Sequence, residues 1–153
     1  MSKPTKFYSD RQEKYISNYL GWDKVTGSGA RDFHPGDVKG YSWLGECKTH
    51  TQIKPTILIQ RKWWHKIITE AIASHKTPVL FVDNGNVKYT WVVTYAIPTN
   101  DTSDVFDIGT NINVGFKLNE IDPTKIYKIS GWTVGFNTPR LMTLHRFYEE
   151  FIV

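Results

Sequence analysis

The length, composition and charge of the chain narrow the classes of protein to which it can belong. Its 153 residues suffice for one domain with a hydrophobic core. A composition of 40% hydrophobic and 22% charged residues excludes a disordered chain. The net charge of +4 is compatible with a polyanionic partner, and the single cysteine excludes an internal disulfide. Because no apolar run approaches the ~20 residues of a membrane helix, we expect no membrane partner and a cytoplasmic protein, in the host cytoplasm if the chain is viral.

The first predicted element is a helix over residues 10–20. Ser9 and Gln12 have the spacing of a capping box, and Gly21 provides a natural stop. Glu13 shares a helical face with the apolar residues three and seven positions further on. We therefore expect the Glu13 carboxylate to point inward.

A β-hairpin is predicted next, with strands over residues 37–39 and 43–49. Because side chains alternate along a strand, Glu46 and Lys48 are expected on one side and Cys47 on the other. This alternation would place a carboxylate and an ammonium group on the same side of the sheet.

A second helix is predicted over residues 62–75, with Lys62 and Lys66 away from its apolar face. The short apolar run over residues 78–82 indicates a buried strand beside this helix. The apolar face of the helix consists of Trp64, Ile67, Ile68, Ala71 and Ile72.

The rest of the chain is predicted to be rich in β-structure and to end in a helix capped by Thr138. We expect an α/β fold: a mixed central β-sheet flanked by helices, with a C-terminal β-rich extension and a terminal helix. The chain is predicted to be a single domain, with a core of about residues 8–98 and an extension of about 99–153. The predicted parts are a hairpin turning at Asn84-Gly85 into 87–97, a loop at 99–104, strands at 112–118 and 126–129, and a helix over 139–151.

Three acidic residues and one lysine in the first third of the chain point to metal-dependent chemistry. Hard cations such as Mg²⁺ prefer carboxylate oxygens, which Asp37 and Glu46 supply from the hairpin and Glu13 from the first helix. The backbone carbonyl of Cys47 is a further candidate ligand. A metal held there polarises a phosphate and activates water, while Lys48 orients that water or balances the developing charge.

These residues resemble the PD-(D/E)XK nuclease superfamily, and most of all its small Holliday junction resolvases from archaea and phages. The resemblance covers roughly residues 8–83. Glu13 matches the inward glutamate of the early helix, and residues 27–29 match a Gly/Ser turn. Asp37 matches the acidic residue of the motif, although a glycine separates it from the preceding proline, and residues 46–48 match the E-X-K triplet.

The resemblance implies a restriction-endonuclease-like core, Mg²⁺ or Mn²⁺ as cofactor, branched DNA as substrate and a homodimer that makes two symmetric cuts. It also implies a further polar residue after the E-X-K strand, and Gln60 occupies that place. The metal ligands implied are Glu13, Asp37, Glu46 and the Cys47 carbonyl, and the catalytic residues are Glu13, Asp37, Glu46, Lys48 and Gln60.

Positive charge is concentrated in the half of the chain that contains this constellation. Residues 1–76 carry 13 Lys and Arg against 7 Asp and Glu, a net charge of +6. Such a surface is typical of phosphate contact, although a basic helix face is often only solvated. The candidate DNA contacts are Ser28, Gly29, Arg31, Lys54, Arg61, Lys62 and Lys66.

The preferred function is a metal-dependent, structure-selective DNA endonuclease, a Holliday junction resolvase. One alternative is a restriction-like or nicking endonuclease of the same superfamily, which would cut linear duplex equally well. Another is a catalytically inactive DNA-binding protein that retains the fold. The sequence leaves both alternatives open.

Overall fold

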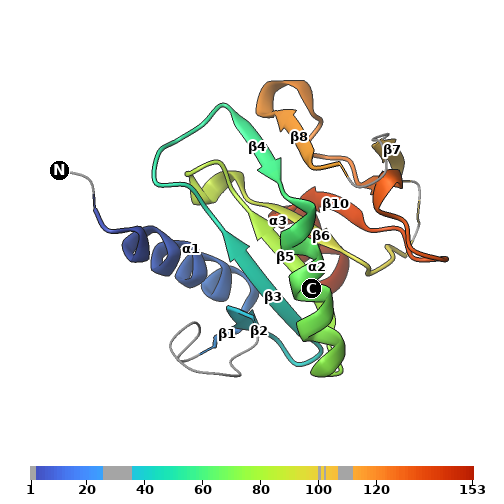
Figure 1. The fold of residues 1–153 in the computed structure, drawn as a ribbon, viewed down its shortest axis with the longest axis horizontal. Helices are drawn as coiled ribbons and strands as arrows, with labels where there is room; N and C mark the ends of the chain where they lie inside the picture. The colour runs from blue at the N-terminus through green and yellow to red at the C-terminus, as the bar shows by residue number, and fades with distance from the viewer. Residues whose placement is uncertain (1–2, 26–35, 100, 102, 107–111) are drawn as a thin grey trace.

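The computed structural model describes residues 3–25, 36–99, 101, 103–106 and 112–153, which form a mixed eight-stranded sheet with helices on both faces (Figure 1). β3 and β5 are parallel, as are β7 and β9, and the other neighbours are antiparallel. The predicted α/β class and mixed sheet are therefore confirmed. In spatial order the strands are β1 (Asp23–Lys24), β2 (Val38–Lys39), β3 (Trp43–Lys48), β5 (Thr77–Val82), β6 (Trp91–Thr94), β10 (Arg140–Thr143), β9 (Tyr127–Ile129) and β7 (Asp104–Phe106).

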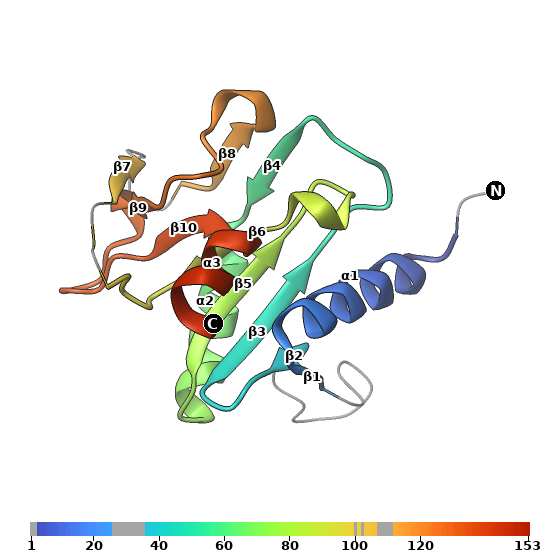
Figure 2. The same ribbon diagram turned by 180° about the vertical axis from the view of Figure 1, so that it is seen from behind.

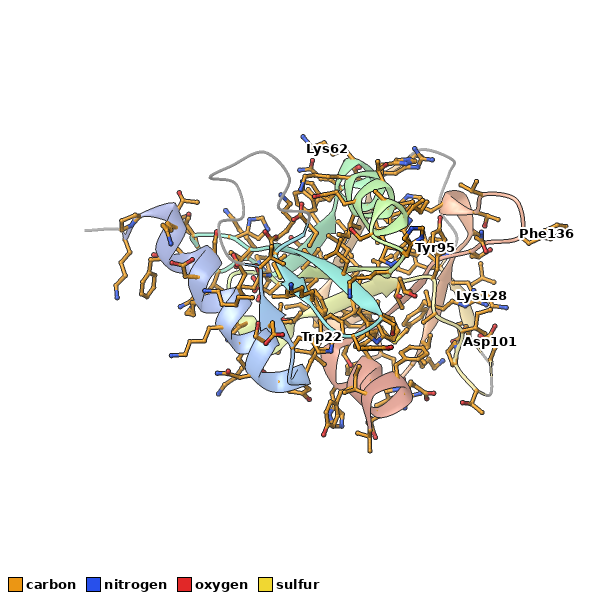
Figure 3. All side chains as sticks on the ribbon, turned by 90° about the horizontal axis from the view of Figure 1, so that it is seen from below. Trp22, Lys62, Tyr95, Asp101, Lys128 and Phe136 are labelled. Atoms are coloured by element: carbon orange, nitrogen blue, oxygen red, sulfur yellow. The ribbon has the colours of Figure 1, made fainter. Side chains whose placement is uncertain are left out.

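The helices lie on opposite faces of this sheet. Helix α2 (Arg61–Ala73) covers one face, together with a small sheet of β4 (Thr56–Ile59) and β8 (Val114–Lys117). Helices α1 (Thr5–Leu20) and α3 (Leu144–Phe147) cover the other face, and Figures 2 and 3 show α3 on the side away from α2. The remaining helical turns are η1 (Val87–Tyr89), η2 (Leu118–Glu120), η3 (Ser130–Trp132) and η4 (Tyr148–Ile152).

Strand β5 joins two hydrophobic cores. Leu80 and Val82 pack with Trp64 of α2 in one core, whereas Val79 and Phe81 belong to the core under α1 and α3. Because both faces of β5 are covered, its apolar residues form a continuous run instead of an alternating pattern. None of the helices within the described ranges combines the length and the apolar character needed to cross a membrane.

Both predicted hairpins are confirmed. β2 pairs antiparallel with β3, and β5 with β6, although the second turn is longer than predicted and contains η1. The strands predicted over residues 112–118 and 126–129 correspond to β8 and β9. β1, β4 and β7 were not predicted. The residues after 98 supply β7, β9 and β10 to the central sheet, so the expected extension is continuous with the core.

The predicted start of the first helix is wrong. α1 begins five residues before the predicted first residue, and Ser9 lies inside it, where its hydroxyl donates to the Thr5 carbonyl at 3.4 Å. An ion pair between Lys6 and Asp10, with 2.6 Å between Nζ and Oδ2, supports the added turn. The expected capping box therefore does not form, while the predicted end of the helix is confirmed.

The prediction of a helix over residues 139–151 is wrong at its start, where Arg140–Thr143 form strand β10. β10 lies between β6 and β9 with both faces covered, so Leu141 and Met142 are both fully buried and the alternation typical of a strand is absent. The cap is Thr143, not Thr138, because the Thr143 hydroxyl accepts from an amide in the first turn of α3 at 3.2 Å. α2 is confirmed within two residues of its predicted ends, but Ile72 is exposed instead of packing on the sheet.

Candidate active site

The turn before β2 fixes Asp37 beside β3. The Asp37 amide donates to the Gly45 carbonyl at 2.8 Å, and Oδ2 of Asp37 accepts from the Cys47 amide at 2.9 Å. The preceding Gly36 has a φ of 71°, and a Cβ there would lie 2.8 Å from Leu44 Cγ. Glycine is therefore required at this turn, which holds the Asp37 carboxylate against the half of β3 that extends past β2.

Glu46 is the buried centre of the site. Its side chain is 3% exposed and faces α2, where Nζ of Lys66 donates to Oε2 at 2.5 Å, while Nζ of Lys48 lies 3.9 Å from the same oxygen. Burial, together with the hydrogen bond and charge of Asp37, raises the pKa of Glu46 to about 7, and Lys66 opposes the rise. The hairpin therefore brings Asp37 and Glu46 within hydrogen-bonding reach, as predicted.

Glu13 approaches the Asp37 carboxylate from α1. Its side chain is partly buried, and burial together with the charge of Asp37 raises its pKa to about 7. Asp37 is thus the shared electrostatic neighbour of Glu13 and Glu46. The inward direction predicted for Glu13 is confirmed in part, because its side chain is only partly buried. The polar residue buried most deeply on α1 is its neighbour Gln12, at 1% exposure.

Two buried polar residues hold the end of β3. Nε2 of Gln12 donates to the Lys48 carbonyl at 2.6 Å, and the amide of Asp83 donates to the same carbonyl at 3.2 Å. The Asp83 carboxylate accepts from the Thr49 hydroxyl and the Gly85 amide, and burial raises its pKa. The backbone at Lys48 is consequently anchored from both α1 and the end of β5.

The predicted alternation along β3 is confirmed. Cys47 packs in the core under α1 and α3, whereas Glu46 and Lys48 face α2. Burial and the surrounding carboxylates raise the pKa of the Cys47 thiol well above its ordinary value, so the thiol stays protonated. The Cys47 side chain is therefore a poor metal ligand, and the role of the Cys47 backbone carbonyl stays a prediction.

The ammonium group of Lys48 lies near an aromatic ring of α2, with Nζ 5.7 Å from the ring centroid of Trp63.

Three of the remaining predicted residues, Gln60, Arg61 and Lys62, lie at the N-terminus of α2. Gln60 precedes α2 in an extended conformation, and its carbonyl accepts from the Trp63 amide at 3.1 Å. Its catalytic role stays a prediction. The Arg61 amide donates to Oδ1 of Asn113 at 3.0 Å, and the exposed Lys62 stands out from α2 (Figure 3).

The other candidate DNA contacts divide into three cases. Lys54 is exposed, and two hydrogen bonds with Asn84 hold its backbone. Lys66 is paired with Glu46 and also lies 3.2 Å from Oε2 of Glu70, so its charge is partly neutralised. Ser28, Gly29 and Arg31 lie outside the described residues. Contact of these residues with DNA stays a prediction.

The sequence-based prediction missed three polar residues of the site: Gln12, Glu70 and Asp83. Gln12 precedes a buried isoleucine by four positions, so the helical period places it on the buried face. Glu70 follows Lys66 by one turn, and its Oε1 accepts from the Gly36 amide at 3.1 Å. Asp83 directly follows β5, whose carboxyl end lies at the same edge as that of the parallel β3. Periodicity and strand order thus contained a signal for all three.

The carboxylates of Asp37 and Glu46 have the donor chemistry that suits a hard divalent cation. Burial and mutual repulsion disfavour the ionised form of Glu46, and a cation between the two carboxylates relieves both effects. Mg²⁺ is commonly held by one or two carboxylates, with water and phosphate oxygens completing its shell. Within the described residues, no group of three or more His, Cys, Asp or Glu side chains is arranged to hold a metal ion. The residues that suit a divalent cation are therefore the Asp37–Glu46 pair, and the role of Glu13 as a further metal ligand stays a prediction.

Comparison with known proteins assigns no family to the chain. No protein-family model matches the sequence, and no curated protein or solved structure matches it. The resemblance to the PD-(D/E)XK superfamily consequently rests on the residues and spacing of the motif, and the chemistry of the site has to carry any functional assignment.

Proposed function

We propose that the chain is a metal-dependent DNA endonuclease that hydrolyses phosphodiester bonds in branched DNA, as a Holliday junction resolvase does. The observation that carries the proposal is the convergence of the Asp37 and Glu46 carboxylates with the Lys48 ammonium group beside β3. A pair of carboxylates with an adjacent cation is well suited to phosphodiester hydrolysis. The resemblance of the motif supports DNA as the substrate.

The proposed roles follow from the positions of the side chains. Asp37 and Glu46 would hold Mg²⁺ or Mn²⁺, with Glu13 and the Cys47 carbonyl as further ligands. When bound, the cation polarises the scissile phosphate and lowers the pKa of a coordinated water. Lys48 orients the attacking water or balances the charge that develops on the phosphate, and the anchored backbone at Lys48 limits the positions its ammonium group reaches.

The proposed assembly is a homodimer in the cytoplasm, or in the host cytoplasm if the chain is viral. Resolving a four-way junction needs two symmetric cuts, and a two-fold dimer presents two equivalent sites to such a substrate. The single cysteine, Cys47, is a free thiol, which suits a reducing compartment.

Cleavage of a four-way junction beside a linear duplex of the same sequence tests the proposed substrate. With Mg²⁺ present, we expect junction cleavage at least about tenfold faster than duplex cleavage, because only the junction meets both sites of a dimer. Equal or faster cutting of the duplex would overturn the resolvase assignment and favour the restriction-like or nicking alternative. DNA binding with no cleavage of either substrate would favour the inactive alternative.

The exposed Lys62 provides a test of the proposed DNA surface. We expect Lys62→Gln to weaken DNA binding and to reduce the slope of log K against log salt by about 0.9, the value for one lost phosphate contact on duplex arms. Fluorescence anisotropy over a range of salt concentrations measures this slope. Lys125→Gln is the matched control, because Lys125 is 53% exposed but lies next to β7 and β9, away from α2. An unchanged slope for Lys62→Gln would remove this part of α2 from the interface.

A further inference from the structure

Lys66 occupies a position between two acidic residues of the site. Its Nζ lies 2.5 Å from Oε2 of Glu46 and 3.2 Å from Oε2 of Glu70, one turn further along α2. The Lys66 side chain is 55% exposed, whereas that of Glu46 is 3% exposed. A solvent-facing cation is therefore paired with a buried carboxylate.

The two acceptors of Lys66 differ in their hydrogen bonding. Oε2 of Glu46 receives the Lys66 hydrogen bond. Oε2 of Glu70 is buried, lies 3.2 Å from the Lys66 ammonium group and, within the described residues, has no other hydrogen-bonding partner. The other oxygen of Glu70 accepts from the Gly36 amide at 3.1 Å, which fixes the carboxylate in place. Glu70 thus presents an oriented oxygen that the Lys66 ammonium group already contacts, and that remains available if the ammonium group leaves Glu46.

A divalent cation at Glu46 would meet the positive charge of Lys66. Nζ of Lys66 is already at hydrogen-bond distance from the buried Glu46 oxygen, and a second cation bound to that oxygen would be repelled by the ammonium group. The cation and the ammonium group therefore compete for one carboxylate.

We propose that Lys66 is an internal counter-ion for Glu46 that a divalent cation displaces, and that Glu70 receives the displaced ammonium group. This inference rests on the proposed metal-dependent function. It assigns Lys66 a role in tuning metal affinity, and Glu70 a positioning role as the second acceptor. Neither role requires either residue to contact the metal.

Titration of Mn²⁺ by calorimetry at pH 8 tests the proposal without relying on catalysis. We expect Lys66→Met to bind Mn²⁺ about 3–10-fold more tightly than the unmodified protein, because the competing charge is gone. Lys66→Arg keeps the charge and is expected to bind like the unmodified protein. Lys125→Met is the matched control, since Lys125 is also a half-exposed lysine paired with a carboxylate, that of Asp104, but lies away from α2.

Glu70→Gln provides a second route that leaves the Lys66–Glu46 pair intact, in case Lys66→Met does not fold. Glutamine still accepts from the Gly36 amide but attracts the displaced ammonium group less, so we expect Mn²⁺ binding about threefold weaker. Unchanged or weaker binding by a folded Lys66→Met, or unchanged binding by Glu70→Gln, would overturn the proposal and leave the metal-dependent function standing. Absence of Mn²⁺ binding by the unmodified protein would overturn both.

Discussion

Glu46→Gln is expected to lower the rate of four-way-junction cleavage at least about 100-fold, which corresponds to the several kcal/mol of stabilisation that a catalytic metal supplies. Glutamine has nearly the same size as glutamate but lacks the negative charge that would hold the cation next to Asp37. Lys66 and Lys48 would then face a neutral amide in place of the carboxylate. Single-turnover cleavage of a labelled junction in Mg²⁺ measures the rate.

Glu120→Gln is the matched control for this loss, because Glu120 lies on η2 with a side chain that is 65% exposed. It is expected to cleave at the unmodified rate. Glu46→Gln is also expected to bind the junction at least as tightly as the unmodified protein, since it removes a buried negative charge from the proposed phosphate-binding site. Full cleavage activity in Glu46→Gln would remove the Glu46 carboxylate from the reaction.

The same substitution is expected to stabilise the fold above neutral pH. The pKa of Glu46 rises from its ordinary 4.5 to about 7, first through burial and then through Asp37. Because the pKa of Glu46 is higher in the folded than in the unfolded state, the protonated carboxyl contributes stability. This contribution is complete below pH 4.5 and is lost as pH rises through about 7. Glutamine resembles the protonated acid. At pH 8 the free energy of unfolding of Glu46→Gln should therefore exceed that of the unmodified protein by about 1–3 kcal/mol, after allowance for the lost ion pair with Lys66.

Urea denaturation at pH 4.5 and pH 8 measures this difference in the free energy of unfolding. The gain should be small at the lower pH, where the Glu46 carboxyl is protonated in the folded state. Glu120→Gln should change stability little at either pH, because an exposed carboxylate with a distant ion-pair partner contributes little. A Glu46→Gln protein that is less stable than the unmodified protein at pH 8 would show that the carboxylate stabilises the fold. Loss of activity combined with a gain in stability is typical of a side chain retained for function.

Local backbone geometry explains why much of this site was predictable. The two-residue period of a strand places Glu46 and Lys48 on one face, whatever the rest of the fold does. A short hairpin brings Asp37 next to Glu46, because few registers of so short a turn are available. These features depend only on residues within about ten positions of one another.

The parts that were not predicted depend on contacts between distant segments. The hydrogen bond between Lys66 and Glu46 spans 20 residues and requires α2 to lie over β3, which a helical period alone does not determine. Gln12 was assigned to a local cap, but its side chain instead reaches the Lys48 carbonyl, 36 residues away. At Gln12 a tertiary partner thus replaced the predicted local one, and at Lys66 a tertiary partner was added to the local pair with Glu70.

The misassigned start of the last helix has a different cause. Arg140 to Thr143 form a strand between two others, and full coverage of both faces removes the alternation that identifies a strand. The spacing of Leu141 and Leu144 also suits a helix, and nothing in the local sequence favours the strand. Only the position of β10 in the sheet decides between the two.

Calorimetric titration of Mn²⁺ at pH 8, comparing the unmodified protein with Asp37→Asn, tests most directly whether the paired carboxylates form a metal site. At this pH both Glu46 and Glu13 are ionised, and Asp23→Asn on the exposed β1 serves as control. We predict that the unmodified protein and Asp23→Asn bind Mn²⁺ alike and that Asp37→Asn binds at least about tenfold more weakly. Equal binding by all three proteins, or no binding by the unmodified protein, would contradict the proposed site.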